Sequence, residues 1–226
     1  MHEKHFSACS MEDLAPLTIF SGASSAGVHT KLASSRDVVA PEIRKAIDAA
    51  KPTQGKILVL VNAMSCGEYY GPNSNGDYFS EANLNPPKEK LASAESKYGY
   101  TTFYDAGVYR HHQNKDPSKS FGSIKVAAFN NTMKRLELLV EIDEAKAREF
   151  GHGDLVDKFH DGKLEPVSMG CRVKYDVCRI DGCGNEARTR AHYCDHAANH
   201  MNADTSDGQV VCVDNPKPVF FDLSFV

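Results

Sequence analysis

The sequence predicts an α+β fold built mainly from antiparallel strands, which form a closed or nearly closed β-barrel with two or three flanking helices. Three observations support this prediction. Short apolar or alternating segments of strand length recur along the chain, and helical periodicity is confined to a few short stretches. A segment rich in cysteine and histidine interrupts the later strands and predicts a small insertion. At 226 residues the chain can bury one substantial core.

The composition is that of a globular protein, with 41% hydrophobic and 25% charged residues. The longest apolar run, 57–61, has the length of a strand and is far shorter than the roughly 20 residues that a membrane helix needs. The first residues lack the basic-then-apolar order of a secretory signal. The net charge of −4 gives no reason to expect a nucleic acid or a membrane as a partner.

Residues 1–38 are rich in Ser, Ala, Gly and Thr, and their stretch 21–27 has the composition of a linker. We therefore expect a flexible, loosely ordered leader before a single domain of residues 39–226. Within that domain, residues 178–206 form the predicted Cys/His insertion. It lies between a strand before it and a strand after it, so we expect it to fold as a small separate unit.

The first half of the domain alternates between helix and strand signals. Residues 41–50 have apolar positions at helical spacing and begin with proline, which costs no hydrogen bond in the first turn. Residues 56–63 are typical of a buried strand. A turn-rich loop at 71–77 follows, and residues 88–97 predict a short helix.

The second half is dominated by strands. We expect a strand at 101–109 and a hairpin of 121–129 with 134–142 across the turn at Asn130-Asn131. Alternation in the second arm of the hairpin predicts one polar face, which carries Glu137. Asp143 is a typical helix N-cap, and the helix after it should run, with glycine interruptions, towards Phe159. The remaining predicted strands are 167–177, 209–213 and 219–226.

The insertion has the ligand types and spacing of a zinc site. Tetrahedral zinc sites take thiolate and imidazole ligands in two pairs, each presented by a tight turn. The seven cysteines are an odd number without an export signal, which argues against disulfides and favours a reducing cytoplasm. Three cysteines of the insertion fall within 17 residues, and a histidine follows the last of them. The predicted ligands are Cys178, Cys183, Cys194 and His196.

His200 is the alternative fourth ligand, one helical turn further along the chain. A Cys3His site has no open position for water, so we expect a structural zinc and no metal in catalysis. Arginines of the insertion are matched by acidic residues, and the insertion is therefore no basic patch for nucleic acid. A contact with another protein fits its composition at least as well.

Three polar residues on or beside predicted strands suggest a nucleophilic site. Ser168 lies in the middle of the apolar segment Pro166-Val167-Ser168-Met169-Gly170, 56 residues after His112. Asp222 is the one carboxylate in the last apolar strand. A serine nucleophile needs a general base within hydrogen-bond distance and a third group that fixes the imidazole. Neighbouring residues of an extended segment point to opposite faces, so only one of His111 and His112 can reach Ser168.

The order of these segments resembles the prohead (capsid maturation) serine proteases of tailed bacteriophages, which are distant relatives of the herpesvirus assemblin proteases. The resemblance is carried by H-x-N-x-D-P from His112, Gly122-Ser123-Ile124, the P-V-S-M-G segment around Ser168, and 220–226. It covers roughly residues 56–177 and 208–226. The cysteine-rich insertion and a longer histidine loop are departures from the compact members of that family.

The resemblance implies a prohead/herpesvirus protease-like fold with Ser168 as nucleophile, His112 as base and Asp222 as the third residue. His111 is the alternate base, and Asp116 or a histidine could replace Asp222. It also implies cleavage of phage scaffold and capsid proteins, and of the protease itself, inside the assembling procapsid in the host cytoplasm. A homo-oligomer is compatible with this reading.

Two other functions fit the same residues. A non-enzymatic, zinc-stabilised virion structural or binding module would keep the Cys/His site and treat Ser168 as a core residue. A metal-dependent hydrolase would instead use His111 and His112 with carboxylates such as Asp105 or Asp116. Chelation would abolish activity at once in the second case, whereas a serine protease would lose activity only if the insertion unfolded.

Overall fold

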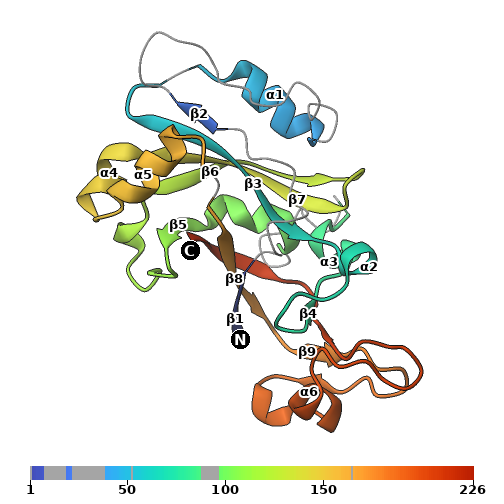
Figure 1. Cartoon of the computed structure of the whole chain (residues 1–226). Helices are drawn as coiled ribbons and strands as arrows, with labels where there is room; N and C mark the ends of the chain where they lie inside the picture. The colour runs from blue at the N-terminus through green and yellow to red at the C-terminus, as the bar shows by residue number, and fades with distance from the viewer. Residues whose placement is uncertain (1, 8–18, 22–38, 52, 88–96, 164) are drawn as a thin grey trace.

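A computed structural model describes residues 2–7, 19–21, 39–51, 53–87, 97–163 and 165–226 (Figure 1). The chain forms an α+β fold around one eight-stranded sheet, which curls into a half-barrel. We expected a closed or nearly closed barrel, but the sheet is open, with β1 at one edge and β2 at the other. In sheet order the strands are β1 (His2–Ser7), β8 (Val167–Val173), β12 (Val219–Phe225), β5 (Gly107–Arg110), β6 (Gly122–Asn130), β7 (Arg135–Asp143), β3 (Lys56–Ser65) and β2 (Ile19–Ser21).

Neighbouring strands of this sheet are antiparallel except for β12 and β5, which run parallel. The predicted strand at 56–63 and the hairpin of 121–129 with 134–142 are confirmed as β3, β6 and β7. Their alternating apolar side chains point into the core, as illustrated by Val59 opposite Val140. This alternation with a period of two is what the strand prediction rested on.

Helix α1 (Pro41–Ala49) covers the outer face of the sheet, where Ile43 packs with Leu60 and Leu139. It begins with proline at its first position, as predicted. The helix also buries part of the face of β7 that we expected to be exposed to solvent. We expected the face that carries Glu137 to be polar, but Glu137 is fully buried beneath α1.

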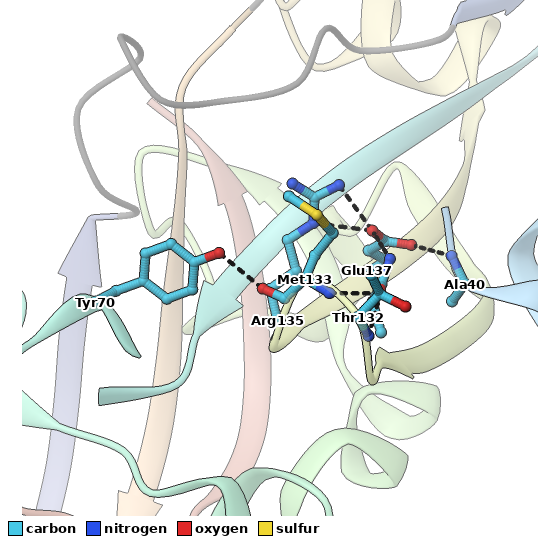
Figure 2. A network of polar contacts seen from close by, with 7 residues as sticks. Ala40, Tyr70, Thr132, Met133, Arg135 and Glu137 are labelled. Atoms are coloured by element: carbon cyan, nitrogen blue, oxygen red, sulfur yellow. Dashed lines mark hydrogen bonds and ion pairs between the residues drawn. The ribbon is translucent and has the colours of Figure 1, made fainter. Parts of the chain in front are cut away.

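Glu137 is held by a network of polar contacts (Figure 2). Its Oε2 atom accepts the backbone N–H of Ala40 at 2.7 Å, just before α1 begins. Its Oε1 atom accepts from Asn130 at 2.8 Å and from the Nε of Arg135 at 2.9 Å. A buried carboxylate is tolerated only when it is paired and hydrogen-bonded, and these donors supply that compensation.

Asp143 caps α4 (Glu144–Glu149), as predicted, by accepting the backbone N–H of Lys146. The predicted glycine interruption falls at Gly151, whose φ of 83° ends α4, and α5 (Gly153–His160) follows. The prediction of a strand at 101–109 was wrong for its first part. Residues Gly99–Asp105 form a 3-10 helix, η5, and only the end of the segment belongs to β5.

A second, four-stranded sheet carries the insertion, and its order is β10 (Glu186–Ala187), β9 (Asp176–Cys178), β11 (Val213–Asp214) and β4 (Asp77–Tyr78). The predicted strand at 209–213 was therefore wrong for all but its last residue. Strand β4 belongs to the loop after α2 (Gly67–Tyr70), so the insertion is tied to a distant part of the chain. The other short helices are α3 (Glu81–Leu84), η6 (Pro117–Lys119), η7 (Arg190–His192) and α6 (Asp195–Asn199).

We expected residues 1–38 to be a flexible leader, but the parts of it that the structure describes are strands. Two stretches, β1 and β2, are edge strands of the main sheet. The rest of this leader, and the predicted helix at 88–97 apart from its last residue, lie outside the described residues. Among the described helices, none combines the length and apolar character that crossing a membrane would require.

Candidate active site and metal centre

Ser168 and Asp222 lie on adjacent strands of the main sheet, and His112 lies in the turn after a third strand. Strand β12 carries Asp222 and lies between β8, which carries Ser168, and β5, after which His112 follows. Alternate residues of β8 pack into the core through Val167 and Met169, which turns Ser168 to the opposite face.

The imidazole of His112 joins the other two side chains. Its Nε2 atom lies 2.7 Å from the Ser168 Oγ, and its Nδ1 atom is hydrogen-bonded to Asp222 Oδ2. Ser168 and Asp222 are buried, whereas 25% of the side-chain surface of His112 is exposed to solvent. In this order of contacts the imidazole can accept the serine proton at Nε2 while the carboxylate fixes the ring at Nδ1.

The carboxylate of Asp222 also accepts hydrogen bonds from Asn114 and Ser224. Asn114 donates its Nδ2 to Oδ2 at 3.1 Å, and Ser224 donates its hydroxyl to Oδ1 at 2.9 Å. A fully buried carboxylate loses its hydration, and such donors replace it. Our sequence reasoning missed both residues. The signal was available, because each lies in a segment that carried the resemblance, two residues from His112 or Asp222.

His111 and Asp116, the alternatives for the base and the third residue, make other contacts. His111 is exposed, and its backbone N–H donates to the carbonyl of Phe225 at 3.0 Å. Asp116 caps the short helix η6 and accepts hydrogen bonds from the hydroxyl and the backbone N–H of Ser118, which lower the pKa of its carboxyl. The carboxylate in contact with the imidazole is therefore that of Asp222, and the imidazole in contact with Ser168 is that of His112.

An ion pair connects the segments that precede the serine and the histidine. Arg110, the last residue of β5, lies 3.5 Å from Glu165, which precedes β8. Both side chains are mostly buried, and Lys158 of α5 also pairs with Glu165. The pair holds the ends of two strands that are not neighbours in the sheet.

The second site is the predicted metal centre. Cys178 ends β9, Cys183 follows in a tight turn, and Cys194 precedes α6, which contains His196. One potential ligand atom from each residue lies within 4.8 Å of all the others. The Nδ1 of His196 is 3.9 Å from the sulfur of Cys178 and 4.0 Å from that of Cys194. These separations bring four ligand atoms of the types that zinc prefers close enough to surround one ion.

The donor set and its support both suit a metal ion. The turn that presents Cys183 is flanked by Gly182 and Gly184, which have φ values of 76° and 55°. Burial raises the pKa of the Cys178 thiol to about 12, so a free thiolate is costly there without a cation. The cluster can therefore hold a metal ion such as zinc. The alternative ligand His200 is exposed and instead lies 3.5 Å from Asp195.

Among the residues that the structure describes, this cluster is the only group of three or more potential metal ligands. Asp105 pairs with Lys97, and Asp116 binds Ser118, so neither gathers with the two histidines. Within the described residues, those of the alternative metal-dependent hydrolase therefore form no cluster of potential ligands.

Comparisons of this chain with protein-family models, with curated proteins and with solved structures find no match. Its function has to be inferred from its own residues.

Proposed function

We propose that this chain is a serine endopeptidase that cleaves scaffold and capsid proteins, and itself, during maturation of a tailed-phage prohead. The observation that carries the proposal is the chain of contacts from Ser168 Oγ through the His112 imidazole to Asp222. Two side chains from neighbouring strands and one from the turn after β5 meet in the order that nucleophilic catalysis requires. Ser168 and Asp222 are buried, and the partly exposed His112 lies between them.

In the proposed mechanism, Ser168 Oγ attacks the scissile carbonyl while Nε2 of His112 takes the hydroxyl proton. Asp222 holds the ring through Nδ1 and stabilises the imidazolium that forms. His112 then gives its proton to the leaving amine, and the peptide carbonyl remains bonded to Ser168 as an ester. Water, deprotonated by His112, hydrolyses this ester and restores the hydroxyl of Ser168.

The substrate class comes from the resemblance to prohead proteases. The geometry supports a serine hydrolase in general, and the order of the motifs around His112, Ser168 and Asp222 adds the phage maturation context. By the same resemblance, we propose that the activity takes place inside the assembling procapsid in the host cytoplasm. Capsid and scaffold proteins are then the expected partners. The proposed activity is also compatible with a homo-oligomer of the chain.

We also propose that the Cys/His cluster holds a structural zinc. Four protein ligands would close the coordination sphere, so the ion would fold the insertion and take no part in hydrolysis. A zinc-stabilised virion module without enzymatic activity is the alternative function that this cluster favours. The two functions differ in whether Ser168 reacts.

Co-expression with phage head proteins tests the proposal. We expect the wild-type chain to cleave them, Ser168→Ala to leave them intact, and Ser123→Ala to cleave as wild type does. Ser123 is a matched control because it is an exposed serine on β6, a strand of the same sheet. Cleavage that persists in Ser168→Ala contradicts the protease assignment. Folded protein that binds zinc but cleaves nothing supports the module instead.

A further inference from the structure

The turn that presents His112 has an unusual backbone. His111 and His112 both have left-handed conformations, with φ values of 48° and 55°. Residues with a Cβ atom adopt this region at a cost in free energy, and two in succession need tertiary contacts to hold them. The contacts come from β12, where the carbonyl of Phe225 accepts the N–H of His111 at 3.0 Å.

The second contact is made by Ser224. Its Oγ accepts the backbone N–H of His112 at 3.1 Å, while the same hydroxyl donates its proton to Asp222 Oδ1 at 2.9 Å. One hydroxyl therefore bonds to the backbone of the histidine and to the carboxylate that holds its ring. Ser224 donates to Oδ1 of Asp222, while Oδ2 is the oxygen that meets the imidazole.

Ser224 also lies opposite the serine of the site. Across the antiparallel pair of β12 and β8, its Cα partner is Ser168, so the two side chains emerge on the same face. Ser224 is fully buried. Its hydroxyl consequently has no access to solvent and is committed to the contacts with His112 and Asp222.

We propose that Ser224 is a positioning residue that sets the distance and angle of the His112 imidazole relative to Ser168. It touches neither the substrate nor the reacting atoms. It acts by fixing the left-handed turn and the Asp222 carboxylate as one unit. The inference rests on the proposed function, since positioning matters only if Ser168 transfers its proton to His112.

Labelling with a fluorophosphonate probe measures this effect on Ser168. We expect Ser224→Ala to lower the maximal labelling rate about 10- to 100-fold, the size of effect that a small misplacement of a catalytic group produces. The probe concentration for half-maximal rate should stay within about twofold, because the probe-binding surface is untouched. Ser224→Thr, which keeps the hydroxyl, should restore most of the rate.

Thr102→Val provides the matched control. Thr102 is a buried hydroxyl that also contacts β12, since its Oγ1 accepts the N–H of Phe220 at 2.9 Å and donates to Gly99. We expect it to lower the melting temperature about as much as Ser224→Ala while the labelling rate stays at the wild-type value. An equal fall of the rate in both variants would reduce the effect to general destabilisation and overturn the proposal.

A second readout does not depend on reactivity. The imidazole N–H of His112 that faces Asp222 should give a downfield proton resonance, which Ser224→Ala should shift or broaden while Thr102→Val leaves it in place. An unchanged resonance together with a wild-type labelling rate in Ser224→Ala would overturn the role of Ser224. If the probe labels Ser168→Ala as fast as wild type, the proposed function fails, and the resonance still decides whether Ser224 positions His112.

Discussion

The Nε2 atom of His112 lies 2.7 Å from the Oγ of Ser168, although the two residues are 56 positions apart in the sequence. Strand β12 makes this contact possible, because it pairs with β8 on one side and with β5 on the other. The serine and the histidine are therefore two strands apart, and the acid lies on the strand between them.

The first prediction concerns the two adjacent histidines. His112→Ala should lower hydrolysis by about 10⁴-fold or more, because it removes the imidazole that lies 2.7 Å from Ser168 Oγ. His111→Ala should stay within a fewfold of wild type, since its ring is exposed. Parallel rate measurements on the two variants check this. Equal and mild effects would contradict the assignment of the base.

The second prediction concerns Asp222. Asp222→Asn preserves the shape of the side chain but removes the charge that holds the imidazole at Nδ1. We expect a loss of about 10⁴-fold in rate with a normal fold, as judged by circular dichroism. Asp116→Asn is the control, because Asp116 caps η6 away from the imidazole and should leave the rate unchanged. A larger loss of rate in Asp116→Asn than in Asp222→Asn would contradict the assignment of Asp222 as the third residue of the site.

The third prediction concerns the metal centre. Purified protein should contain about one zinc per chain, and Cys194→Ser should lose it together with a large part of its thermal stability. His200→Ala should keep the metal, because His200 lies beside Asp195 rather than in the cluster. Metal analysis by mass spectrometry checks both variants. Full zinc content in Cys194→Ser would show that the ion, if present, is bound elsewhere.

The fourth prediction concerns the buried network in Figure 2. Glu137→Ala should destabilise the fold by about 3–5 kcal/mol, because it leaves the buried guanidinium of Arg135 without its partner. Denaturant unfolding measures this loss. Glu141→Ala is the control, since Glu141 lies on the same strand and is only partly buried, 3.6 Å from Lys125. Its effect should stay below about 1 kcal/mol.

The fifth prediction concerns pH. Hydrogen bonds from the Lys56 ammonium and from the backbone N–H of Lys146 hold the pKa of Asp143 below its ordinary value. A carboxyl with a lowered pKa in the folded state stabilises the fold above its unfolded pKa of about 4, and this stabilisation is lost as pH falls through the folded pKa. Asp143→Asn should therefore be less stable than wild type at pH 7, by less than about 1 kcal/mol because the pair is partly exposed.

The measurement is the free energy of unfolding of both proteins from pH 7 to pH 2. The difference between them should shrink as the carboxyl of Asp143 becomes protonated. Asparagine still caps a helix well, so the comparison isolates the charge. A difference that stays constant down to pH 2 would contradict the assigned cause.

The elements that could be predicted from the sequence are those with a local signal. Helix α1, strand β3, the β6–β7 hairpin and strand β12 each follow from periodicity, proline or turn residues within the segment itself. The strand expected at 101–109 was wrong for residues 101–105, which belong to the 3-10 helix η5, although their threonines and aromatic residues favour a strand.

Features that depend on distant residues could not be predicted in this way. Glu137 is buried because α1 covers it, and its contact with Ala40 spans 97 residues. Strand β4 joins the insertion to the core by pairing with β11, and nothing in its own two residues indicates this. The donors Asn114 and Ser224 belong to the site only because β12 lies beside the histidine turn.

Mapping the site of fluorophosphonate modification tests the central claim most directly. Peptide mass spectrometry of the labelled wild-type chain should find one adduct on Ser168, and His112→Ala should suppress it while Ser123→Ala leaves it unchanged. An adduct on another residue, or labelling of Ser168 that is independent of His112, would contradict the account.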